Sequence, residues 1–151
     1  MIIKPAHPSD SELLTNITKK SKAYWGYSGE QMDIWSEALT ITEAYIETNS
    51  VYKLVLDNLI IGYYSFFYEN ENTIRLDNLF ILPDYIGKGY GQLLMEDLLL
   101  RITAMKIKKI VLHADPNAER FYLKFGFTTT GRIENFNKDR YLPVMELNSI
   151  S

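Results

Sequence analysis

The chain has 151 residues, of which 46% are hydrophobic and 23% are charged, and its net charge at pH 7 is −3. These values predict one compact globular domain over residues 1–151 and argue against a nucleic-acid-binding surface. The sequence has no cysteine, which excludes disulfides, thiolate metal sites and cysteine nucleophiles. No apolar run is long enough for a signal peptide or a membrane span, so we expect a cytoplasmic protein without a membrane partner.

The first fifty residues predict one strand followed by helical segments. Residues 1–6 have the composition of a short strand, and Ser9 and Asp10 form a helix-start signal. The segments expected after that signal are a helix from Glu12 to Trp25, a helix from Gln31 to Leu39 and a short turn from Thr42 to Glu47.

The hydrophobic period changes from helical to strand-like after residue 50. Two runs rich in β-branched and aromatic residues, 51–57 and 59–68, are joined at Asp57-Asn58, which favours a hairpin turn. Residues 73–82 follow a second turn and have the same composition. This region therefore predicts a three-stranded antiparallel meander.

Three glycines in five residues follow the third strand of the meander. Gly87, Gly89 and Gly91 are costly, since glycine in regular structure is roughly 0.5–1 kcal/mol less favourable than alanine. Their spacing fits neither a P-loop nor a dinucleotide fingerprint, so either an ordinary turn or an anion-binding loop remains. The helix after the loop is expected to bury the stripe of Leu94, Leu98, Ile102 and Met105.

The C-terminal third alternates strand and helix. Residues 108–114 predict a buried strand, and 115–127 predict a short helix capped by Asn117 and stopped by Gly126. A final hairpin is expected over 127–147. The element order, β-α-α-β-β-β-α-β-α-β-β, is that of a mixed α/β domain.

Two segments resemble motifs of the GNAT superfamily of acetyl-CoA-dependent N-acetyltransferases. "LFILPDYIGKGYGQLLM" is similar to motif A, in which a strand leads through [QR]-x-x-G-x-[GA] into a helix, and "DPNAERFYLKFGF" is similar to motif B. The element order resembles the family over essentially the whole chain. The resemblance implies a GNAT-like fold, with a central, mixed and mostly antiparallel sheet flanked by helices.

The function implied by the resemblance is acetyl transfer from acetyl-CoA to a primary amine of a small molecule or peptide. The amine would attack directly in a ternary complex, without a metal. Ile86 stands where the family has Gln or Arg, and its side chain cannot donate a hydrogen bond to a phosphate. A catalytically silent acyl-CoA-binding module of the same fold is therefore the alternative.

The resemblance also implies the residues that would hold acetyl-CoA. The pantetheine arm is expected along the backbone of Leu79, Phe80 and Ile81 and at Asn117. Tyr122 would contact the cofactor and protonate the departing thiolate. The pyrophosphate is expected on the loop formed by Ile86, Gly87, Lys88, Gly89, Tyr90, Gly91 and Gln92.

The general base and the acceptor site are less defined. Asp77 is the preferred base, and His113 or a water chain are the alternatives. The acceptor amine is expected at Asp77, Trp25, Tyr27 and Arg140, although aromatic side chains at such positions also serve packing. A homodimer stays open.

Overall fold

The computed structural model describes residues 1–134 and 141–148, and the chain divides into two compact units. The first unit comprises Met1–Phe66 and Asn78–Leu98, and the second comprises Phe67–Asp77 and Leu99–Ser151. The expectation of a single domain over 1–151 stays a prediction. Among the described residues, no helix is both long and apolar enough to span a membrane.

The first unit holds most of the helices. Its complete elements are β1 (Ile2–Pro5), the 3-10 turn η1 (Pro8–Asp10), α1 (Ser11–Tyr24), α2 (Gly29–Trp35), α3 (Glu43–Thr48), β2 (Ser50–Leu56) and the 3-10 turn η2 (Pro83–Tyr85). Strand β3 (Leu59–Asn70) lies mostly in this unit. Strand β4 (Thr73–Ile81) and helix α4 (Tyr90–Ala104) are shared with the second unit.

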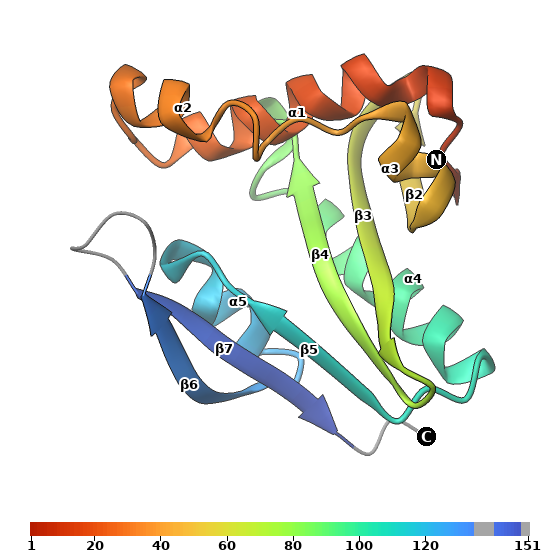
Figure 1. Cartoon of the computed structure of the whole chain (residues 1–151). Helices are drawn as coiled ribbons and strands as arrows, with labels where there is room; N and C mark the ends of the chain where they lie inside the picture. The colour runs from red at the N-terminus through yellow and green to blue at the C-terminus, as the bar shows by residue number, and fades with distance from the viewer. Residues whose placement is uncertain (135–140, 149–151) are drawn as a thin grey trace. The chain divides into compact units, whose positions relative to one another are not determined.

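The second unit holds the C-terminal elements. They are β5 (Lys109–His113), the 3-10 turn η3 (Pro116–Ala118), α5 (Glu119–Leu123), β6 (Thr128–Glu134) and β7 (Tyr141–Asn148). Strand β7 pairs antiparallel with both β5 and β6, and α5 lies against this group of strands (Figure 1).

The strands are hydrogen-bonded in the order β1-β2-β3-β4-β5-β7-β6. Strand β4 pairs parallel with β5, whereas the pairs β1–β2, β2–β3, β5–β7 and β6–β7 are antiparallel. The predicted mixed and mostly antiparallel sheet is therefore confirmed. The predicted order of helices and strands is also confirmed, except that the structure contains one additional helix.

That addition is helix α3, where the sequence predicts only a turn. The Thr42 hydroxyl accepts a hydrogen bond from the Tyr45 N–H at 3.0 Å, which caps the helix. The second predicted helix is shifted, since α2 begins at Gly29 and ends at Trp35 rather than Leu39. Its N-cap is Ser28, whose hydroxyl accepts from the Gln31 N–H at 3.0 Å.

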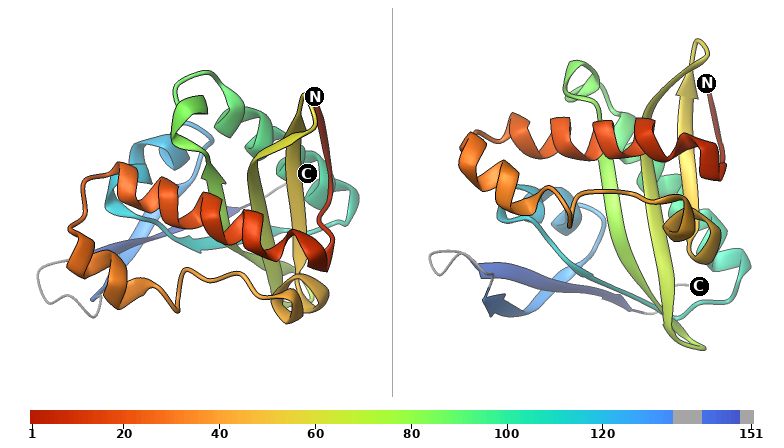
Figure 2. Two further views of the ribbon diagram at one scale, coloured as in Figure 1. Left: turned by 90° about the horizontal axis from the view of Figure 1, so that it is seen from above. Right: turned by 45° about the horizontal axis from the view of Figure 1, so that its top comes forward.

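In the first unit, helices cover both faces of strand β3. The Tyr63 hydroxyl bonds to the Thr18 hydroxyl of α1 at 2.6 Å, whereas the Tyr64 hydroxyl donates to the Asp97 carboxylate of α4 at 2.7 Å. Neighbouring residues of a strand point to opposite faces, so α1 and α4 lie on opposite sides of the strands. Figure 2 shows α1 in front of β3 and α4 behind it.

Two backbone features of the β2–β3–β4 meander depend on the sequence. Asp57 and Asn58 both adopt positive φ, 49° and 65°, which is the geometry of the tight hairpin turn that the sequence predicts. Gly62 allows β3 to approach β4 closely. A Cβ atom there would lie 2.8 Å from the Phe80 carbonyl oxygen and 2.6 Å from Cδ1 of Ile81.

Helix α4 confirms most of its predicted stripe. Leu94, Leu98 and Ile102 are fully buried. Met105 was predicted on the same stripe, and that prediction is wrong. The helix ends at Ala104, Lys106 turns the chain with a φ of 61°, and Met105 is 37% exposed.

Candidate functional site

The glycine loop is a sharply bent connection from η2 to α4. Gly87 and Gly89 have φ values of 83° and 87°, a left-handed conformation that glycine adopts without steric cost. The Gly89 carbonyl accepts the first helical hydrogen bond, from the Leu93 N–H at 3.1 Å. The loop therefore ends at the N-terminus of α4, as the sequence predicts.

The loop presents a run of unpaired backbone amides. None of the N–H groups of residues 87–92 donates a hydrogen bond to another described residue, whereas the Ile86 N–H is used by the Pro83 carbonyl at 3.2 Å. Consecutive free N–H groups at a helix N-terminus create a positive potential that favours a bound anion. The arrangement fits a phosphate group held by the main chain.

The side chains around the loop are largely engaged with one another. The Lys88 ammonium lies 5.8 Å from the centroid of the Tyr85 ring, and Tyr85 meets the Tyr90 ring edge-on at 6.0 Å. The Gln92 amide donates to the Glu96 carboxylate at 2.9 Å. Lys88 is exposed, so its charge can still contribute to the potential at the loop.

Strand β4 leads to the loop and is shared between the two units. Within the second unit, its residues Thr73–Arg75 pair parallel with β5. The Ile81 carbonyl accepts a hydrogen bond from the Ser21 hydroxyl of α1. Of the three residues expected to pair with the pantetheine arm, Leu79 and Phe80 are half-buried and Ile81 is buried.

A half-buried polar cluster around Asn78 of β4 was not predicted from the sequence. The Asn78 amide nitrogen donates to the Ser65 hydroxyl at 3.0 Å and to the Tyr45 hydroxyl at 3.3 Å, and these two hydroxyls bond to each other at 2.8 Å. Asp77 is exposed and precedes Asn78 on the strand, so the two side chains point to opposite faces. A helix start that includes Tyr45 could have been predicted from the spacing, because an N-cap hydroxyl such as that of Thr42 accepts from an N–H up to three residues later.

Arg75 is a second residue that the sequence analysis missed. Its guanidinium donates to the His113 imidazole, with 2.9 Å between Nη2 and Nε2, and to the Glu69 carboxylate at 3.4 Å. Burial lowers the pKa of His113, and the positive charge of Arg75 lowers it further. His113 is thus neutral at pH 7, but its accepting nitrogen is already engaged by Arg75.

Tyr122 lies in the second unit and is 8% exposed. Its ring is held edge-on by Phe121 at 5.2 Å and by Phe127 at 5.6 Å. No described residue takes a hydrogen bond from its hydroxyl. Burial raises the pKa of Tyr122 above its ordinary value, and the negative charge of Asp115 adds to the shift, so the hydroxyl stays protonated at neutral pH.

Asn117 is exposed in η3, beside Asp115. The prediction that Asn117 caps the helix is wrong, because the Asp115 carboxylate accepts from the Asn117 N–H at 2.9 Å. The Asn117 side-chain amide donates to the same carboxylate oxygen at 2.9 Å. Asp115, which lies two residues after β5 and precedes a proline, carried the capping signal.

The aromatic residues between α1 and α2 form two pairs. Trp25 is 44% exposed and meets Tyr24 edge-on at 5.3 Å, while Tyr27 meets Trp35 edge-on at 4.9 Å. The Lys22 ammonium lies 5.4 Å from the Trp35 ring centroid and 5.7 Å from that of Tyr27. Trp35, which lies on α2 one turn from Gln31, was not singled out from the sequence.

Two further expectations concern Arg140 and the absence of a metal. Arg140 lies outside the described residues. Within residues 1–134 and 141–148, no three His, Asp or Glu side chains are grouped so that they could hold a metal ion. The expectation that the protein needs no metal stays a prediction.

Comparison with known sequences identifies relatives over most of the chain. A family model described as an acetyltransferase (GNAT) domain matches residues 26–148. An uncharacterized N-acetyltransferase of Mycobacterium tuberculosis is 31% identical over 98 residues, which are 60% of this chain and 63% of that protein. An uncharacterized acetyltransferase of Streptococcus pyogenes serotype M3 is 31% identical over 90 residues, 59% of this chain and 63% of that protein. The matches thus span less than two thirds of these relatives.

Solved structures share the fold at low sequence identity. The PaiA N-acetyltransferase of Thermoplasma acidophilum, in complex with coenzyme A, has a TM-score of 0.80 at 19% identity and covers 97% of this chain and 98% of its own. A GNAT family acetyltransferase of Elizabethkingia anophelis with acetyl-CoA bound has a TM-score of 0.72 at 20% identity, covering 97% of each chain. These similarities confirm the predicted fold class.

Proposed function

The chain belongs to the GNAT acetyltransferase family, and from that premise we propose that it transfers the acetyl group of acetyl-CoA to a primary amine of a small molecule or peptide. The observation that carries this proposal is the run of unpaired amides at residues 87–92. Such a run binds phosphate, and the diphosphate of coenzyme A is the natural occupant in this family. Two related structures contain coenzyme A or acetyl-CoA.

The cofactor is expected to bind chiefly through the main chain. The amides from Gly87 to Gln92 would hold the pyrophosphate, with Lys88 as an additional positive charge. Ile86 contributes neither a side-chain donor nor its N–H, which is bonded to Pro83. We therefore expect coenzyme A to bind more weakly than it would if an arginine stood at position 86.

The pantetheine arm is expected to pair with the backbone of β4 in the manner of an added strand. Leu79 and Phe80 are the main candidates, because the Ile81 carbonyl already accepts a hydrogen bond from Ser21. Asn117 is the proposed side-chain contact. Its exposed amide, oriented by Asp115, supports that role.

Acetyl transfer requires an acceptor amine without its extra proton, since an ammonium has no lone pair for attack. We assign Asp77 as the base, acting directly or through water, because its side chain is exposed to solvent. His113 is the weaker candidate, since Arg75 occupies its accepting nitrogen. Acetyl-CoA supplies the thioester carbon that the amine attacks.

Tyr122 is the proposed acid that returns a proton to the departing thiolate. A buried hydroxyl without an acceptor among the described residues costs about 1–3 kcal/mol, so it favours a catalytic role over a purely structural one. The raised pKa of Tyr122 keeps this proton in place at neutral pH. This argument also favours an active enzyme over a silent acyl-CoA-binding module.

The acceptor amine is expected to meet aromatic faces at Trp25 and Tyr27. The Lys22 ammonium lies over the Tyr27 and Trp35 rings, and this contact supports the role of Tyr27, whose ring can accommodate a cation. Acceptor contacts by Asp77 and Arg140, a homodimer and a cytoplasmic location stay predictions.

The decisive experiment combines coenzyme A titration by calorimetry with thiol release from acetyl-CoA against a panel of primary amines. Saturable binding and amine-dependent thiol release are expected. Binding without release for any amine would identify the silent module instead. If coenzyme A does not bind at all, the assignment of the loop is wrong.

A further inference from the structure

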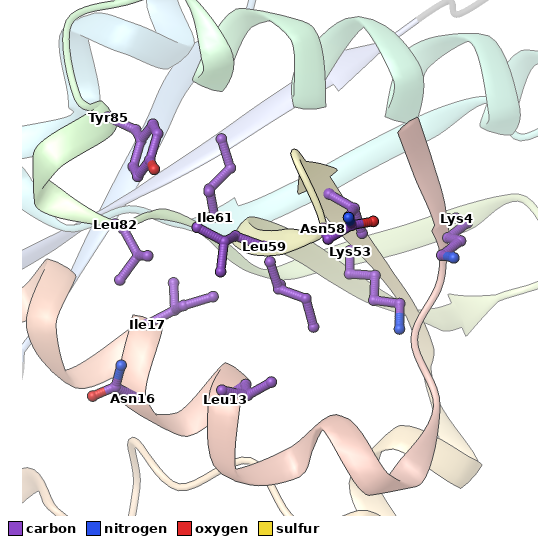
Figure 3. Close-up of a pocket in the computed structure, with 12 residues that line it drawn as sticks. Lys4, Leu13, Asn16, Ile17, Lys53, Asn58, Leu59, Ile61, Leu82 and Tyr85 are labelled. Carbon is purple, nitrogen blue, oxygen red and sulfur yellow. The ribbon is translucent and has the colours of Figure 1, made fainter. Parts of the chain in front are cut away.

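A concave depression in the first unit is separate from every residue that the proposed reaction uses. It has a volume of about 460 Å³ and lies between α1, the β2–β3 hairpin and η2 (Figure 3). Ligand-binding pockets for small molecules typically measure about 300–1,000 Å³, so this depression is large enough for one. A protein partner would typically bury about 800 Å² on each side of the interface, which is a larger area than this depression offers.

The depression has an apolar floor and an apolar rim. Ile17 and Ile61 form part of the floor and are 1% and 0% exposed. Leu13 of α1 and Leu59 of the hairpin stand at the rim, 53% and 59% exposed. A hydrocarbon group placed between them would remove two large apolar side chains from water, which favours binding.

The two ends of the depression differ in charge. Figure 3 shows Lys4 and Lys53 at one end, and Tyr85 and Leu82 at the other. None of the described residues that line the depression carries a carboxylate. The Lys53 ammonium is paired with Asp10 at 2.7 Å, whereas Lys4 is exposed and forms no ion pair with any described residue. An anionic group is therefore the complementary partner at the lysine end.

We infer that this depression is a second ligand site, which binds a small amphipathic carboxylate. The hydrocarbon part would lie on Ile17 and Ile61 between Leu13 and Leu59, and the carboxylate would meet the Lys4 ammonium. An apolar body with one anionic end fits both features, whereas an amphipathic amine would place its positive charge beside the Lys4 ammonium. The inference does not depend on the proposed acetyl transfer.

The test is a titration of the full chain with octanoate, followed by two-dimensional amide NMR. Saturable shifts at Leu13, Leu59 and Leu82 are expected. Octylamine has the same chain with the opposite charge, and acetate has the same charge without the chain, so both should bind at least ten-fold more weakly. Equal binding of octylamine, shifts confined to other residues, or no saturation would overturn the inference.

Two variants identify the site independently of acetyltransferase activity. Leu59→Glu places a carboxylate at an exposed rim position and should weaken octanoate binding at least ten-fold, and Leu13→Glu repeats the test on α1 if the hairpin variant misfolds. Lys4→Gln should weaken octanoate binding, whereas Lys20→Gln, an exposed lysine of α1 outside the depression, should not. Unchanged octanoate binding in the rim variants would contradict the proposed occupant. So would the absence of octanoate binding together with a dimer, detected by analytical ultracentrifugation, that Leu59→Glu dissociates.

Discussion

The hydroxyl of Tyr122 fits poorly with a purely structural role. Its ring has edge-on aromatic neighbours in Phe121 and Phe127, as a core residue would, but the oxygen has no partner among the described residues. Functional groups are often kept at a cost to stability, because activity requires them to remain available. Stability and turnover should therefore respond in opposite directions to its removal.

We expect Tyr122→Phe to lower turnover by about 100- to 10,000-fold, the usual contribution of a positioned acid. The free energy of unfolding should stay the same or rise, since an unsatisfied hydroxyl is removed without loss of the ring. Turnover with saturating substrates and urea unfolding measure the two effects. Tyr68→Phe, at a 53% exposed position, is the control. Wild-type turnover in the variant would return Tyr122 to a structural role.

Ile86 offers a gain-of-function test at the glycine loop. The residue is half-buried and ends η2 with an extended backbone, φ −69° and ψ 142°. Ile86→Arg should strengthen coenzyme A binding, because a guanidinium can form a charge-assisted hydrogen bond to phosphate that is worth about 1.5–3 kcal/mol. Calorimetric titration measures the change, with Ile86→Leu as the control. An intact fold without any gain would mean that this position does not face the phosphates.

The glycine loop acts as one element, whose function depends on backbone conformation rather than on side chains. Gly89 and Gly26 form a useful pair, since their φ values are 87° and 85° and neither would place a Cβ atom within 4 Å of another group. An alanine at either position therefore carries the same left-handed strain, about 1–2 kcal/mol. For coenzyme A binding, the relevant difference is that Gly89 lies in the loop, whereas Gly26 follows the end of α1.

Gly89→Ala should weaken coenzyme A binding at least ten-fold, because a methyl group and a relaxed backbone both disturb the amides that the phosphates approach. Gly26→Ala should lose the same amount of stability but should bind coenzyme A with wild-type affinity. Calorimetry and thermal unfolding of both variants give the comparison. Equal affinities in the two variants would exclude the loop as the phosphate site.

The α1–α2 connection is the second element with a functional prediction. Its Tyr27–Trp35 pair already holds the Lys22 ammonium, and exposed contacts of this kind contribute about 0.5–1 kcal/mol. Trp35→Leu should therefore raise the KM for the acceptor amine about two- to five-fold and leave kcat unchanged. Ile34→Leu, at a neighbouring position that is 66% exposed, serves as the control. A fall in kcat without a change in KM would contradict binding by these rings.

At the scale of the whole molecule, a partly buried ion pair links the first helical segment to strand β2. The Asp10 carboxylate accepts from the His7 N–H at 2.8 Å and from the Lys53 ammonium at 2.7 Å. Burial alone would raise the pKa of Asp10, but the hydrogen bonds from Lys53 and His7, with their positive charges, outweigh it and lower the pKa. A lowered carboxylate pKa contributes stability above the unfolded-state value, and this contribution disappears as the pH falls through the native pKa.

Asp10→Asn should reduce the free energy of unfolding at pH 7 by about 1–3 kcal/mol, because a largely buried ammonium loses its counter-ion. The difference from the wild type should shrink only as the pH falls below about 3.9, the ordinary aspartate value, because the lowered native pKa keeps the wild-type carboxylate charged down to that pH. Urea unfolding across this range measures it, and Glu71→Gln at an exposed turn is the control. A difference that is independent of pH would exclude the ion pair as its cause.

Local signals explain the parts of this protein that the sequence alone determined. The Asp57-Asn58 turn, the glycine loop and the buried stripe of α4 each depend on residues within about two helical turns of one another, so composition and spacing predict them. The element order followed from the same periodicities. The acetyltransferase motifs were recognisable for the same reason, since each is a continuous segment.

Only the tertiary structure decided which distant side chains meet. Asn78 finds Ser65 and Tyr45, and Arg75 finds His113, because strand register and helix packing bring together residues that are 13 to 38 positions apart. The same packing engaged His113 as a hydrogen-bond acceptor and buried the Tyr122 hydroxyl, which has no acceptor among the described residues. No periodicity encodes such pairings, because the energy that selects them comes from burial and hydrogen bonding that exist only once the chain has folded.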